Sequence, residues 1–177
     1  MFEMKLVSER AAREAEKNIK SVKFGPKIDT LVDSLWKQAT DAYFDGKYTA
    51  AVLVGGVCAE AAHRFYCKAK GVPSKRVRGK WEALIRYSVS QNMLPHQSVG
   101  AVLDLIRRDY RNPWIHLDIN QITKKVPRSG MDKTLTAMIF SGQLALNCLW
   151  LTAVELSAFY GSYPVLGEPA IMLPRTP

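Results

Sequence analysis

The stretch that most constrains the fold is 131–160, a long and largely apolar run of helical character. Polar side chains interrupt it at short intervals: Ser141, Gln143, Asn147, Thr152 and Glu155. A membrane-spanning helix needs about twenty mostly apolar residues with few or no charges. We therefore predict a helix that is buried in a protein core or in a dimer interface, and no membrane span. Gln143 and Asn147, four residues apart, share one face of this helix, as a self-paired interface would use.

Apolar residues recur at helical spacing through most of the remaining chain. They predict helices over 8–21, 28–45, 47–70, 81–92 and 95–110. No alternating pattern typical of strands and no internal repeat is present in the sequence. The fold class predicted is therefore all-α, an up-and-down helical bundle of four to five helices with an N-terminal charged helix.

Three segments are expected along the 177 residues. Residues 1–27 form an N-terminal charged helical arm, 28–160 form the bundle, and 161–177 form an irregular tail rich in proline and glycine. The arm either lies across a partner or is a frayed surface helix. The three cysteines have no framework spacing and lie in apolar surroundings, which is typical of reduced thiols. No signal peptide opens the chain, and we expect a cytoplasmic protein.

Two adjacent glycines, Gly55 and Gly56, lie in the middle of the predicted helix 47–70. Glycine is unfavourable in a helix interior because it loses the most backbone freedom on folding. We expect these two residues to allow close backbone approach by a neighbouring helix.

The net charge of +9 is concentrated in the middle of the chain, where residues 47–130 carry fifteen basic and five acidic side chains. Such a localised basic field attracts polyanions, although charge that serves solubility alone is an open alternative. The candidate RNA-binding residues are Lys75, Arg76, Arg78, Lys80, Arg107, Arg108 and Trp114. An aromatic ring, from Trp81 or Trp114, would stack on a base, and for Trp81 a core position is favoured.

The segment Arg111-Asn112-Pro113-Trp114-Ile115-His116 carries the candidate catalytic residues. Arginine holds phosphate through a flat, permanently charged fork, and histidine exchanges protons near neutral pH. Asn112 precedes a proline and should break the helix before it, which would display Arg111 and His116 at a helix end. The alternative is an arginine that caps a helix C-terminus beside a surface histidine.

Metal chemistry is not favoured by the spacing of candidate ligands. Cys58 and Cys67 are nine residues apart and would point in opposite directions on one helix, so the two cysteines cannot share an ion. His63 and Cys67, with Glu60, could share one face, but three such groups buried in a helix are more often structural. Acidic residues in 47–130 are few and widely spaced, whereas a two-metal nuclease needs clustered carboxylates. We predict no metal and no cofactor. RNA is then the better substrate, because it carries its own nucleophile in the 2′-hydroxyl.

Residues 29–160 resemble the HEPN superfamily of small helical bundles. The resemblance runs through the segments 51–60, 81–85, 93–95 and 110–116 in order. It is greatest with branches that have an Arg-Asn-Pro-x-x-His turn before a long last helix. The resemblance implies a homodimer in which the arginine and histidine motifs of both copies meet in one cleft. It also implies metal-independent ribonuclease activity, in a superfamily where many members are toxins or antiviral effectors and others have no demonstrated activity.

The resemblance assigns roles residue by residue. Arg111 matches the family arginine, Asn112 the polar residue after it, and His116 the histidine. Two His116 side chains would supply a base for the 2′-hydroxyl and an acid for the leaving oxygen. Glu60, inside an apolar helix, is expected to support the site by pairing with Arg111 or His63, although a purely structural pair is equally open.

Two hypotheses follow. The first is a dimeric endoribonuclease, acting as a toxin or defence effector with a protein partner such as an antitoxin. The second is a non-catalytic HEPN module that binds a protein, a nucleotide or RNA through the same cleft. Fold analogy alone does not choose between them.

Overall fold

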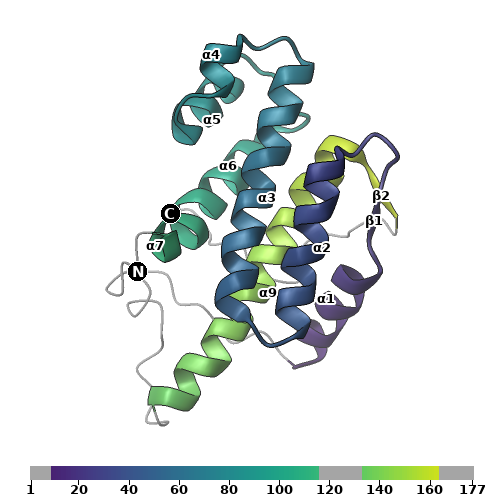
Figure 1. Cartoon of the computed structure of the whole chain (residues 1–177), viewed down its shortest axis with the longest axis vertical. Helices are drawn as coiled ribbons and strands as arrows, with labels where there is room; N and C mark the ends of the chain where they lie inside the picture. The colour runs from purple at the N-terminus through teal and green to yellow at the C-terminus, as the bar shows by residue number, and fades with distance from the viewer. Residues whose placement is uncertain (1–8, 116–132, 164–177) are drawn as a thin grey trace.

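A computed structural model describes residues 9–115 and 133–163, and these residues are mostly helical (Figure 1). In chain order the elements are α1 (Glu9–Ser21), β1 (Lys23–Phe24), α2 (Thr30–Phe44), α3 (Tyr48–Ala69), α4 (Ser74–Val77), α5 (Trp81–Ser90), α6 (Gln97–Leu105), the π-helical turn η1 (Ile106–Arg111), α7 (Asn112–Ile115), α9 (Lys133–Tyr160) and β2 (Ser162–Tyr163). The prediction of an all-α helical bundle is confirmed.

The long helix α3 is the centre of the bundle and packs against α2 and α9 (Figure 1). Its buried face consists largely of small side chains, which allow the helices to approach closely: Ala51, Val52, Gly55, Gly56, Cys58, Ala59 and Ala62. All three cysteines are buried free thiols, and burial raises the pKa of Cys67 to about 11 and that of Cys148 to about 12. These thiols therefore behave as small apolar core groups.

Helix α9 supplies most of the remaining core, because it is buried continuously from Leu144 to Ala153. Of the helices described within 9–115 and 133–163, none is long and apolar enough to cross a membrane. The burial predicted for the last long helix is thus confirmed. Asn147, one of the two residues suggested for a self-paired interface, hydrogen-bonds Tyr110 within the same chain.

The N-terminal helix packs within its own chain. Ala15 and Ile19 of α1 are buried in the main core, and the Tyr43 hydroxyl donates to Glu16 Oε1 at 2.7 Å. Beyond α1, Lys23 pairs with Tyr163 in a short antiparallel ladder that joins β1 to β2. Residues 9–21, for which the sequence predicted a partner-binding arm or a frayed surface helix, therefore belong to the bundle.

The prediction that Asn112-Pro113 breaks the preceding helix is wrong. Helix α6 continues through η1 into α7, and Asn112 keeps helical dihedral angles, φ −65° and ψ −44°. Its amide donates to the carbonyl of Arg107, five residues back. In an α-helix the ring of Pro113 would clash with the carbonyl four residues back, and the wider π turn displaces the carbonyls that precede it. Arg111 consequently lies inside a continuous helical run that faces α3.

Candidate functional site

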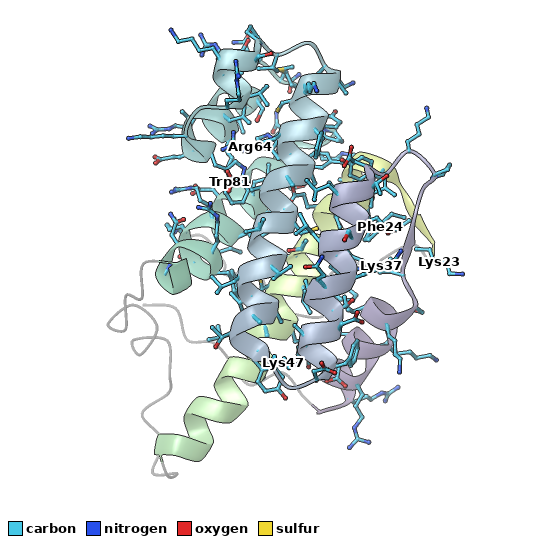
Figure 2. All side chains as sticks on the ribbon, in the orientation of Figure 1. Lys23, Phe24, Lys37, Lys47, Arg64 and Trp81 are labelled. Carbon is cyan, nitrogen blue, oxygen red and sulfur yellow. The ribbon has the colours of Figure 1, made fainter. Side chains whose placement is uncertain are left out.

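Arg111 lies in an open hollow of about 370 Å³ between α3, the start of α5 and η1. The lining residues are Glu60, Arg64, Lys80, Trp81, Glu82, Arg107, Arg111 and Asn112. Four of these side chains are basic and two are acidic, so the hollow carries a local excess of positive charge. Figure 2 shows Arg64 of α3 and Trp81 of α5 next to each other on this side of the bundle.

The Arg111 side chain is held on three sides and is 25% exposed. Its Nη2 lies 2.7 Å from Glu60 Oε2, its Nη1 donates to Asn112 Oδ1 at 3.1 Å, and its guanidinium lies 5.7 Å from the Trp81 ring centroid. The Nε atom is buried with no hydrogen-bond partner among the described residues. The expected pairing of Glu60 with Arg111 is confirmed, and the functional roles of both residues stay predictions.

The backbone of α3 passes directly beneath Arg111 at Gly56. A Cβ atom at Gly56 would lie 2.8 Å from Arg111 Cβ, which is closer than two carbon atoms can pack. A Cβ atom at Gly55 would lie 3.4 Å from the Leu149 Cδ2 of α9, an almost ordinary contact. The close approach predicted for the glycine pair is therefore confirmed at Gly56, where η1 packs against α3, whereas Gly55 has room for a methyl group.

Two lining residues, Arg64 and Glu82, were not predicted from the sequence, and Arg64 makes the more extensive contacts. Its Nε and Nη2 donate to Glu60 Oε1 at 2.9 and 2.5 Å, so Glu60 bridges Arg64 and Arg111. Its Nη1 donates to the carbonyl of Val77, and its Nη2 also donates to the carbonyl of Gly79 at 2.9 Å. The spacing of four residues between Glu60 and Arg64 signals their ion pair. No pattern in the sequence signals the two carbonyl contacts.

Behind the hollow, His63 and Trp81 form a buried hydrogen-bonded pair. Trp81 Nε1 donates to His63 Nδ1 at 3.2 Å, which assigns the proton of the neutral imidazole to Nε2. Nε2 then donates to Ser88 Oγ at 3.0 Å, and the Ser88 hydroxyl donates to the Ile85 carbonyl. Trp81 is 4% exposed, so the favoured core position is confirmed. Its ring lies against the Arg111 guanidinium and is too buried to stack on an RNA base.

The acid sensitivity of this pair gives a testable prediction. Desolvation by burial, followed by the charge of Arg64, lowers the pKa of His63 from 6.5 to about 4. The unfolded chain therefore takes up a proton first, and stability falls as the pH drops from 6.5 towards 4. We expect His63→Gln, which does not titrate, to lose less stability over this range when unfolding is followed in urea. Equal losses in both proteins would contradict the assignment.

The other candidate RNA-binding residues have different surroundings. Lys75, Arg76, Arg78 and Lys80 are exposed on α4 and the turn after it, and of these only Lys80 lines the hollow. Arg76 stacks over the Tyr87 ring at 4.4 Å. Arg107 Nη2 pairs with Asp104 at 2.7 Å, and Arg108 Nε pairs with Asp109 at 3.0 Å. To bind phosphate, each of these two arginines would therefore have to leave its carboxylate or contact both anions at once.

His116 lies outside the described residues, as does the side chain of Trp114. Within 9–115 and 133–163, no three His, Cys, Asp or Glu side chains are grouped closely enough to hold a metal ion. No family model, no curated protein and no solved structure matches this chain.

Proposed function

We propose that this protein is a metal-independent endoribonuclease of the HEPN type that acts as a homodimer. The observation that carries the proposal is the position of Arg111, which is partly exposed in a basic hollow of about 370 Å³. A buried arginine that served only to cap a helix would not need an open site lined by three further cations.

The chemistry would divide between two side chains. Arg111, oriented by Glu60 and Asn112, would hold the scissile phosphate and stabilise negative charge on its non-bridging oxygens. His116 of one copy would accept the proton of the 2′-hydroxyl, and His116 of the second copy would protonate the departing 5′-oxygen. The P–O5′ bond breaks as the P–O2′ bond forms, which leaves a 2′,3′-cyclic phosphate and a 5′-hydroxyl.

A second candidate is a non-catalytic module that binds RNA, a nucleotide or a protein partner through the hollow. The ion pair between Arg111 and Glu60 favours it, because a carboxylate 2.7 Å away already neutralises the arginine. A phosphate would have to add to this pair or displace the carboxylate. Binding without cleavage is therefore the alternative outcome of the same experiment.

The test is cleavage of mixed-sequence RNA in EDTA by the full chain and by the variants Arg111→Ala and His116→Ala. We expect each substitution to lower the cleavage rate by about a hundredfold or more, as removal of a general acid–base group or a charge-stabilising donor does. Lys37→Ala is the matched control, because Lys37 forms an exposed ion pair on α2, away from the hollow (Figure 2).

Cleavage that survives either substitution would refute the proposed mechanism. A well-folded dimer that binds RNA but does not cleave it would support the non-catalytic module. The cleaved products distinguish the mechanism further, because a 3′-hydroxyl product would require a different nucleophile.

A further inference from the structure

The contacts of Arg64 are those of a residue that joins two segments of the chain, and they leave few donors for a ligand. It lies on α3 one turn after Glu60, and each of its three guanidinium nitrogens already donates within the chain. Its partners are one carboxylate and the backbone carbonyls of Val77 and Gly79. An incoming phosphate would therefore find few unused donors on Arg64, although the side chain lines the hollow.

The segment that Arg64 holds is short and lightly packed. Helix α4 has only four residues and none of them is buried. Val77 is partly buried and packs against the smaller apolar cluster of Cys67, Val72 and Leu84. The last carbonyls of a helix lack partners within the helix, and a cation at that end is favourable. Arg64 satisfies the carbonyls at the end of α4 and of the turn that follows, and so fixes this segment against α3.

Lys80 directly follows the second carbonyl that Arg64 binds. It is exposed, it lines the hollow with Arg111, and within the described residues no carboxylate pairs with its ammonium group. Among Lys75, Arg76, Arg78 and Lys80, Lys80 is thus the cation that lines the hollow and can meet an anion beside Arg111. Its position depends on residues 77–79, whose carbonyls Arg64 holds.

We propose that Arg64 is a positioning residue that places Lys80 beside Arg111, so that both cations bind the backbone of one single-stranded RNA. The inference rests on the proposed RNA-binding function of the hollow. It assigns to Arg64 a geometric role, which a lysine cannot fill, because a single ammonium group cannot reach the carboxylate and two carbonyls in the same fork-shaped arrangement.

The test is binding of a 2′-O-methylated single-stranded RNA, which cannot be cleaved through its 2′-oxygen, to the full chain. Arg64→Lys conserves the net charge, yet we expect it to weaken binding about tenfold and to lower the salt dependence by about one phosphate contact. We expect the same effect from Lys80→Ala. In the double variant the second substitution should cost less than about twofold, because both remove the same contact. Lys37→Ala should bind as the wild type does.

Hydrogen exchange provides the structural readout. The amides of residues 76–79 are held by turn hydrogen bonds to Pro73, Ser74 and Arg76, and we expect faster exchange there in Arg64→Lys, with the other helices unchanged. Wild-type affinity in Arg64→Lys, multiplicative losses in the double variant, or unchanged exchange over 76–79 would each overturn the inference. So would a wild-type chain that does not bind the probe. Binding with the expected coupling but no cleavage of natural RNA would refute the ribonuclease and leave the role of Arg64 intact.

Discussion

Replacement of Glu155 by methionine is expected to stabilise the protein at neutral and alkaline pH. Glu155 of α9 is completely buried, and neither carboxylate oxygen has a hydrogen-bond partner among the described residues. Desolvation raises the pKa of this carboxyl well above its ordinary value of 4.5. An apolar side chain of similar length should therefore fill the site without the cost of a buried polar group, about 1 to 3 kcal/mol.

The same carboxyl predicts the direction of the pH dependence. Its folded pKa is raised, so its contribution to stability is fully present below pH 4.5 and is lost as the pH rises towards the folded pKa. Each pH unit in that interval lowers the free energy of unfolding by about 1.4 kcal/mol per proton. We expect Glu155→Gln to remove this decline when urea unfolding is compared between pH 4 and pH 9.

The negative charge of Glu155 also raises the pKa of two neighbouring groups, Cys148 and Tyr160. Its charge adds to the burial that raises the pKa of Cys148 and Tyr160, and the Tyr160 hydroxyl is also buried without a described partner. In the folded protein Cys148 and Tyr160 titrate with a pKa of about 12, above the pH range of the experiment, so the difference between wild type and Glu155→Gln over pH 4 to 9 reports on the carboxyl. Glu14→Gln is the control, because Glu14 is exposed on α1. Parallel pH profiles for wild type and Glu155→Gln would show that the carboxyl is hydrated or paired in solution.

The second large effect is expected at Gly56. An alanine there would place its Cβ 2.8 Å from Arg111 Cβ and 3.1 Å from Arg111 Cγ, so η1 must move away from α3. Overpacking of this kind costs about 1 to 3 kcal/mol, which exceeds the gain of about 1 kcal/mol in helix propensity. We expect Gly56→Ala to lower the melting temperature and to weaken RNA binding, because the ion pair between Arg111 and Glu60 is displaced.

Gly55→Ala is a matched control on the adjacent residue. Its Cβ would meet the end of the Leu149 side chain at 3.4 Å, a group that can shift by rotation. The same gain in helix propensity is then not offset, and stability should stay within about 1 kcal/mol of the wild type or rise. Circular dichroism melts of the two variants would separate the effects. Equal melting temperatures would show that η1 does not press on α3 at Gly56.

Local sequence patterns were sufficient to predict the fold class, the burial of the last long helix and the close approach at Gly56. These features depend on local patterns, because apolar residues at helical spacing define one face of a helix whatever it packs against. It also indicated that Glu60 needs a cationic partner, since an unpaired carboxylate inside an apolar helix is costly. The spacing of single elements was sufficient for each of these predictions.

The presentation of Arg111 depends on how η1 packs in the bundle and could not be predicted from local patterns. Proline chemistry predicted a helix break at Asn112, but a π turn packed against α3 widens the helix and keeps Asn112 helical. The contacts of Arg64 with the carbonyls of Val77 and Gly79 join residues 13 and 15 positions apart in the chain. Such contacts depend on the rotation of each helix about its axis and on the course of the connecting turn, which only the packing of the whole bundle determines.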